Sequence, residues 1–227
     1  MAGESDDRKP GEGLGEEIVD ERLRSAWRSW LSALANDAEA AMAAALAYES
    51  LPDDGRQAWL DALEADAPDL GVPAVALYAP LLAVESDPAR RRRIEAAMGA
   101  DVESGRVGGG DTRALRGVAP DGTHACVVVA PLYLDFVQVL WCRYTPTGGF
   151  VTVRHDPLLH SGDVAGVREL HGVALEPTPL RVVVEELAHA ILADRRGQRV
   201  TPAALASFAH LFAPHLDDGE DADPSRP

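Results

Sequence analysis

The spacing of apolar residues changes along this chain of 227 residues, from a helical to a strand pattern, across one glycine-rich stretch. Apolar side chains recur every three or four positions before residues 101–111, and they alternate after it. Because helices and strands need different periods, one domain type cannot account for both halves. The sequence therefore predicts a helical domain at 15–100 and an α+β domain at 112–215, joined by a glycine-rich linker at 101–111.

The first domain is expected to be a bundle of about five short helices. The first helix begins near Glu16 and carries an apolar stripe at helical spacing. Asn36-Asp37 and Asp87-Pro88 are typical helix starts, because an Asp side chain caps free backbone N–H groups and proline suits the first turn. Pro80 interrupts the fourth apolar segment, so a kink or an end of the hydrogen-bond ladder is expected there.

The second domain is expected to combine an antiparallel β-meander of about four strands with a helical hairpin that packs on it. Thr178-Pro179 and Thr201-Pro202 predict the two helix starts, and Gly197 and Pro214 predict the ends. The fold class is thus α+β. The expected strands, each bounded by turn residues, are 114–119, 123–130, 133–144 and 150–155.

The formal net charge of −16 is concentrated at the two ends of the chain. Residues 1–14 and 216–227 are acidic and poor in large apolar residues, which predicts a disordered arm and a disordered tail. A negative body disfavours nucleic-acid backbones and anionic membrane surfaces. Two cysteines and no leader-like apolar start favour a cytoplasmic protein with no membrane segment.

Lys9 is the single lysine, and it lies in the acidic arm. The remaining basic residues are arginines, which stay protonated near neutral pH and cannot act as amine nucleophiles. Schiff-base chemistry and P-loop phosphate binding both need a pocket lysine. These activities are therefore not expected of the folded part, and no cofactor is predicted for it.

Residues 155–163 are a candidate metal site, because they place imidazoles and carboxylates in a loop expected after a strand. Glu186 and His189, three residues apart on the first C-terminal helix, add a further pair. The competing interpretation is a solvated polar surface, since His189 lies opposite the apolar stripe of its helix with Glu186 beside it. The candidate ligands of one transition metal ion are His155, Asp156, His160, Asp163 and His189.

Two further clusters have alternative interpretations. Arg90–Arg93 lie near a helix start, where positive charge is unfavourable, so carboxylates within the chain, an acidic partner or nucleic acid must compensate them. Pairing within the chain is the favoured explanation. Trp27, Trp30 and Trp59 are expected to fill the core of the first domain, and the alternative is that they anchor a groove for a partner.

These observations favour a non-enzymatic protein-interaction module, an adaptor or accessory subunit of a cytoplasmic assembly whose partner is another protein. The alternative is a metal-dependent hydrolase that uses the His/Asp cluster at residues 155–163.

Overall fold

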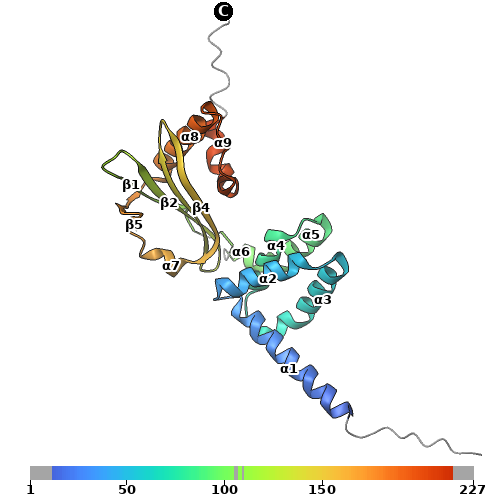
Figure 1. Ribbon diagram of the computed structural model, residues 1–227. Helices are drawn as coiled ribbons and strands as arrows, with labels where there is room; N and C mark the ends of the chain where they lie inside the picture. The colour runs from blue at the N-terminus through green and yellow to red at the C-terminus, as the bar shows by residue number, and fades with distance from the viewer. Residues whose placement is uncertain (1–11, 105–106, 109, 217–227) are drawn as a thin grey trace, which may run out of the picture. The chain divides into compact units, whose positions relative to one another are not determined.

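A computed structural model describes residues 12–104, 107–108 and 110–216, with side chains from Glu21 onward. In this part of the chain, helices are followed by an antiparallel sheet and then by further helices, which confirms the predicted α+β class (Figure 1). The chain divides into two compact units, Met1–Glu103 and Ser104–Pro227, here called the helical unit and the sheet unit.

The predicted arm at 1–14 and tail at 216–227 lie largely outside the described residues. At the described ends, the first helix begins at Glu12 and the last helix ends at Leu216.

The described part of the helical unit contains the five predicted helices and a short sixth that extends into the predicted linker. Their bounds are α1 (Glu12–Ala33), α2 (Ala38–Ser50), α3 (Asp53–Leu70), α4 (Ala74–Val84), α5 (Pro88–Ala97) and α6 (Gly99–Glu103).

Local capping explains where two of these helices start. The Asp37 side chain accepts hydrogen bonds from the backbone N–H groups of Glu39 and Ala40 at 2.9 and 3.1 Å. Asp87 caps α5 in the same way, with Pro88 in the first turn. Both starts follow the sequence prediction because a cap depends only on neighbouring residues.

Pro80 lies inside α4, which continues as a helix to Val84. Proline removes one backbone donor, yet the helix is buried along most of its length, and Pro80 itself is buried. Packing on several sides stabilises the helix where its own ladder is interrupted. The core of the helical unit forms around this element, with Leu34, Leu60, Leu63, Tyr48, Leu77, Leu81 and Ile94 all at most 1% exposed.

The sheet unit is built on five antiparallel strands in the order β4-β3-β2-β1-β7. The four predicted strands form the meander, and β7 adds a fifth strand beside β1. The bounds are β1 (Arg113–Val118), β2 (His124–Tyr133), β3 (Phe136–Thr145), β4 (Gly149–His160) and β7 (Glu176–Thr178).

Strand β4 continues through the segment that was expected to be a loop. Residues 155–160 pair with β3, so the prediction of a loop at the candidate metal ligands is wrong. Pro157 lacks an N–H group, but β4 lies at the edge of the sheet, where a strand needs fewer ladder bonds. The register shifts between Val137 and Val139 of β3, which leaves an extra β4 residue beside the proline.

The chain between β4 and β7 covers one face of the sheet. It forms α7 (Ser161–Ala165) and a small hairpin of β5 (Glu169–Leu170) and β6 (Val173–Ala174). Apolar residues of this segment pack on alternate residues of β2 and β3; the buried members of this cluster are Ala125, Val127, Val129, Val137, Val139, Val164, Val173 and Leu175.

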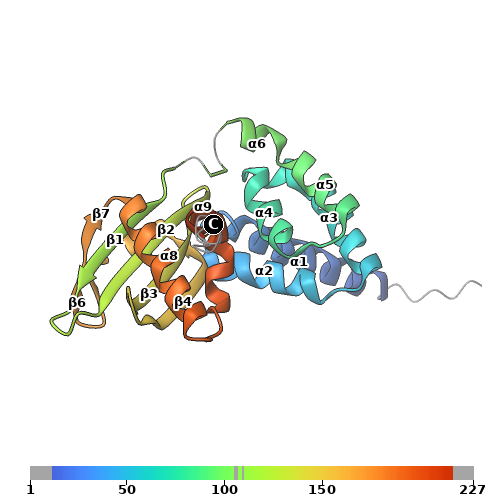
Figure 2. The same cartoon turned by 90° about the horizontal axis from the view of Figure 1, so that it is seen from above.

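The other face of the sheet is covered by the C-terminal helices α8 (Leu180–Arg196), η1 (Ala203–Phe208) and α9 (Ala209–Leu216), as Figure 2 shows. The predicted helical hairpin is present, but its second arm begins as a 3₁₀ helix and continues beyond Pro214 to Leu216. Leu187, Ile191, Phe208 and Phe212 of these helices are at most 2% exposed against the sheet.

Candidate functional site

His155 and Asp156, the first two candidate metal ligands, lie on β4 opposite Leu140 and Val139 of β3. Because successive side chains of a strand point to opposite faces, the two residues face different layers. The His155 ring lies 5.6 Å from the ring of Phe208 on the helix-covered face, and burial lowers its pKa.

Asp156 is engaged on the opposite face of the sheet. Its Oδ2 atom accepts a hydrogen bond from Trp141 Nε1 at 2.7 Å and one from Arg154 at 2.9 Å. The Arg154 guanidinium lies over the Trp141 ring, 4.9 Å from its centroid. Asp156 therefore belongs to a surface cluster of an indole, a guanidinium and a carboxylate.

The other three candidate ligands are separated from this pair. His160 ends β4, and its Nδ1 atom accepts the backbone N–H of Gly162 at 3.2 Å. Asp163 is exposed on α7, and His189 is exposed on α8. Among the described residues, no group of three or more His, Cys, Asp or Glu side chains is arranged to hold a metal ion.

Glu186 has a different environment from the one that its helical position suggested. Its Oε2 atom accepts hydrogen bonds from Tyr144 Oη at 2.6 Å and from Arg116 Nε at 2.8 Å. His124 Nδ1 lies 3.0 Å from the same oxygen. The interpretation of Glu186 as part of a solvated face is thus wrong, because three side chains of the sheet contact its carboxylate.

These contacts determine the ionisation of the cluster. Burial alone would raise the pKa of Glu186, but the hydrogen bonds from Arg116, Tyr144 and His124 outweigh burial and lower it. Burial and the carboxylate both raise the pKa of Tyr144. The sequence showed Glu186 as an i, i+3 partner of His189, and nothing local indicated that strand residues 42 to 70 positions away would bind it.

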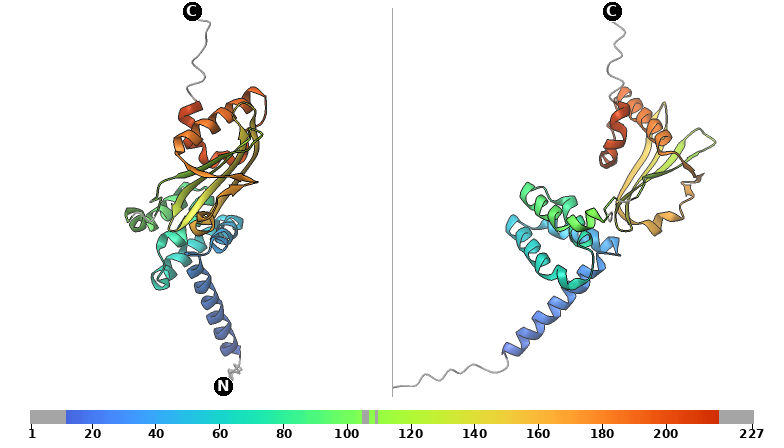
Figure 3. Two further views of the ribbon diagram at one scale, coloured as in Figure 1. Left: turned by 90° about the vertical axis from the view of Figure 1, so that its left-hand side faces the viewer. Right: turned by 180° about the vertical axis from the view of Figure 1, so that it is seen from behind.

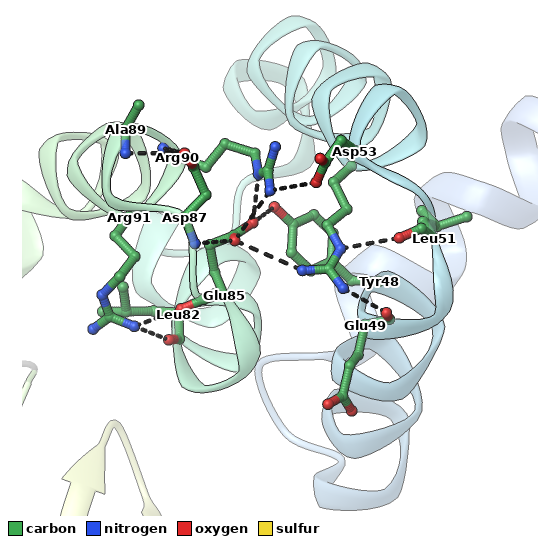
Figure 4. A network of polar contacts seen from close by, with 11 residues as sticks. Tyr48, Glu49, Leu51, Asp53, Leu82, Glu85, Asp87, Ala89, Arg90 and Arg91 are labelled. Carbon is green, nitrogen blue, oxygen red and sulfur yellow. Dashed lines mark hydrogen bonds and ion pairs between the residues drawn. The ribbon is translucent and has the colours of Figure 1, made fainter.

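Glu85 is the corresponding polar centre of the helical unit, and Figure 4 shows its contacts. Its side chain is fully buried at the C-cap of α4. Tyr48 Oη donates to Oε2 at 2.6 Å, and Arg90 Nε donates to the same oxygen at 2.7 Å. The Asp87 backbone N–H donates to Oε1 at 2.7 Å, and Arg56 lies 3.7 Å from that oxygen.

Arg90 and Arg93 are therefore compensated by carboxylates within the chain, as the favoured interpretation stated. Arg90 also pairs with Asp53 at 2.9 Å. Arg93 pairs with Asp61 and Glu64 of α3 at 2.8 and 2.7 Å. Arg91 donates to the backbone carbonyls of Leu82 and Glu85, and Arg92 donates to the Pro88 carbonyl.

The three tryptophans of the helical unit contact one another. Trp27 lies 5.5 Å from Trp30 and 5.1 Å from Trp59, measured between ring centroids. All three are partly exposed, so they form the edge of the core. Trp27 Nε1 donates to Asp66 at 3.1 Å, which ties α1 to α3.

The outer side of α2 is apolar where a surface helix is normally charged. Met42 is 39% exposed and Leu46 is 62% exposed, with exposed Ala43 between them. The opposite side of the same helix is fully buried through Ala41, Ala44 and Tyr48, as the 3.6-residue period requires. We call Glu39, Met42, Ala43, Leu46 and Glu49 the α2 outer face; all five are exposed.

Two cavities of about 320 and 250 Å³ adjoin the end of the β2–β3 hairpin. Pro131, Val137 and Ser161 line both of them, whereas none of the predicted histidines does. The Tyr133 hydroxyl beside the smaller cavity is buried and has no hydrogen-bond partner among the described residues.

No protein-family model, curated protein or solved structure matches this chain. Within the described residues, no helix has both the length and the apolar composition needed to cross a bilayer. Its function is therefore inferred from its own surface and contacts.

Proposed function

We propose that this chain is a non-enzymatic protein-interaction module of a cytoplasmic assembly, and that it binds a protein partner through the α2 outer face. The observation that carries the proposal is the exposure of Met42 and Leu46 on a helix whose other side is fully buried. A helix that is apolar on all sides is normally covered on all sides, so an uncovered apolar side is a surface for another molecule.

The ends of this face indicate the chemistry of the partner. Glu39 and Glu49 flank the apolar residues, and neither carboxylate has an ion-pair partner among the described residues. Ten residues of helix separate them by about 15 Å. The partner is accordingly an apolar protein segment flanked by Lys or Arg side chains at about that separation.

Two other features support the proposal. One argues against nucleic-acid binding, and the other argues for a reducing compartment. The guanidinium groups of Arg90 and Arg93 are occupied by carboxylates of the same unit, so they are not available to phosphates. Cys126 and Cys142 are directly opposed on β2 and β3 and remain free thiols. A pair of reduced cysteines in this position is typical of a reducing compartment.

The proposal is tested with full-length protein as bait in extract from the source organism, followed by binding measurements on the purified partner. The double variant Met42→Ser/Leu46→Ser should raise the dissociation constant at least tenfold. Val151→Ser is the control, because Val151 is an aliphatic residue of the sheet unit whose exposure of 56% lies between the 39% of Met42 and the 62% of Leu46. It should leave the affinity unchanged.

Charge reversal gives the second arm of this test. Glu39→Arg/Glu49→Arg should weaken binding, and the loss of affinity relative to the wild type should be larger at low salt than at high salt. Salt ions screen the wild-type attraction, so less of it remains to be lost at high salt. The proposal would be removed if none of these α2 substitutions changed the affinity. It would also be removed if the wild type and the double variant captured the same proteins from the extract.

A further inference from the structure

The first helix is only partly held by the helical unit. Leu31, near the end of α1, is fully buried, and Trp27 and Trp30 contact Trp59 of α3. One turn before Trp27, Leu23 is 63% exposed. Figures 1 and 3 show the first half of α1 extending beyond the other helices of its unit.

A projecting helix of this kind needs a contact that the helical unit does not supply. The 22 residues of α1 span about 33 Å at 1.5 Å per residue. Short isolated helices are marginal in water, and most helices in proteins are stabilised by packing of an apolar side. Leu23 continues the apolar stripe of Trp27 and Trp30 along α1. The stripe therefore extends beyond the residues that pack on the other helices of the unit.

The order of charges along α1 identifies the molecule that covers it. Five of the ten residues from Glu12 to Glu21 are acidic and none is basic. The following twelve, from Arg22 to Ala33, contain no acidic residue and three arginines, of which Arg28 pairs with Asp66 of α3 at 2.9 Å, so Arg22 and Arg24 supply the basic charge. Two such helices laid antiparallel bring each acidic half against a basic half, whereas parallel pairing opposes like charges.

We infer that this chain forms a dimer in which the first half of α1 pairs antiparallel with α1 of a second copy. The interface is isologous, because the same stripe and the same charge order face themselves across a two-fold axis. Leu23 lies at its centre, and the Glu21–Arg24 contact of 3.4 Å within one helix gives way to contacts between copies. This surface is separate from the α2 outer face, so the dimer stands or falls independently of the proposed function.

The test is the mass of the full-length protein in solution, measured by light scattering and sedimentation over a concentration series at 150 mM salt. The wild type should reach twice the 24.1 kDa of one chain. Leu23→Glu should return the mass to that of one chain. Leu46→Glu is the matched control: the same substitution on another helix of the same unit, at a leucine that is 62% exposed instead of 63%. It should leave the dimer intact.

A charge exchange distinguishes this dimer from other modes of association. The variant Asp20→Arg/Glu21→Arg has basic residues at positions 20, 21, 22 and 24. The variant Arg22→Glu/Arg24→Glu has acidic residues at the same four positions. Each variant alone should be monomeric, and an equimolar mixture should regain the dimer, because opposite charges then meet across the pair. Circular dichroism and urea unfolding verify that every variant is folded.

Three outcomes overturn the inference. The first is a wild-type monomer throughout the concentration series. The second is a dimer that Leu23→Glu does not dissociate. The third is a mixture of the two charge variants that stays monomeric. A monomer in which Leu23→Glu lowers the stability of the chain would indicate instead that α1 is covered within the same molecule.

Discussion

The hydroxyl of Tyr48 donates a 2.6 Å hydrogen bond to Oε2 of Glu85, which joins the last turn of α2 to the end of α4 across 37 residues. Both side chains are buried, and Arg90 neutralises the carboxylate from α5. Three helices are thereby fixed to one charge. The helical unit depends on this buried centre as well as on its apolar core.

Replacing Glu85 by Gln should destabilise the protein by about 3 kcal/mol, because the change leaves the Arg90 guanidinium, 14% exposed, without its main partner. Urea unfolding at pH 7 measures the effect. Glu95→Gln is the control: Glu95 is 52% exposed, lies 4.0 Å from Arg91, and should cost about 0.5 kcal/mol or less. Equal losses for the two variants would contradict a special role for Glu85.

The same carboxylate predicts how stability depends on pH. Burial would raise the pKa of Glu85, but hydrogen bonds from Arg90, Tyr48 and the Asp87 backbone lower it to about 2. An unfolded chain titrates Glu near 4.3, so the ionised folded form is favoured above that pH. This stabilisation is present above about pH 4.3 and is lost as the pH falls towards 2.

The expected measurement is a comparison of wild type and Glu85→Gln by urea unfolding between pH 7 and pH 2.5. The difference in unfolding free energy should be constant down to about pH 5 and should narrow below about pH 4.3. A difference that widens as the pH falls would show that the protonated carboxyl is the favoured form in the folded protein.

The contrast between Asp87 and Glu85 shows what the sequence could predict. Asp87 caps its own helix, and the contact is local, so the Asp-Pro pair was enough to predict it. Glu85 is two residues away, yet its burial depends on Tyr48 and Arg56, which come from a different part of the chain. The sequence predicted that the arginines pair with carboxylates of the same chain, which is what the structure shows for Arg90 and Arg93. Most of those carboxylates could not be identified from local spacing.

Strand β4 shows a second limit. Pro157 is a residue that normally interrupts a strand, which agrees with the predicted loop at the histidines and carboxylates. The edge position and the register shift against β3 allow the strand to continue instead. The regular alternation of a strand then places His155 and Asp156 on opposite faces. Neither the edge position nor the shift can be read from one strand alone.

Glu185 and Glu186 make this limit testable, because they are neighbours that both flank the apolar stripe of α8. Glu186 accepts hydrogen bonds from Tyr144 and Arg116, and its side chain is 21% exposed. Glu185 pairs with Arg181 one turn earlier and is 40% exposed. Glu186→Gln should cost about 2 kcal/mol, because it weakens charge-assisted bonds to buried Tyr144 and partly buried Arg116.

Glu185→Gln is the control for this substitution and should change stability by at most about 0.5 kcal/mol. Urea unfolding of both variants under the same conditions makes the comparison. If Glu185→Gln were the more damaging change, the contact between α8 and the sheet would have to be rotated from the one described.

The β3–β4 turn provides the sharpest steric prediction. Gly149 has φ +84°, and a Cβ atom there would collide with the Asp194 carboxylate, which is 2% exposed and held by Arg199 Nε at 2.7 Å. Gly122 has φ +81° with open space around it. Gly122→Ala should therefore cost only the backbone strain, about 1 kcal/mol. Gly149→Ala should add a packing cost of about 1–3 kcal/mol, since the carboxylate cannot move without losing its partner. Thermal and urea unfolding of the two variants separate these costs, and equal losses would mean that the turn and the end of α8 are not in contact.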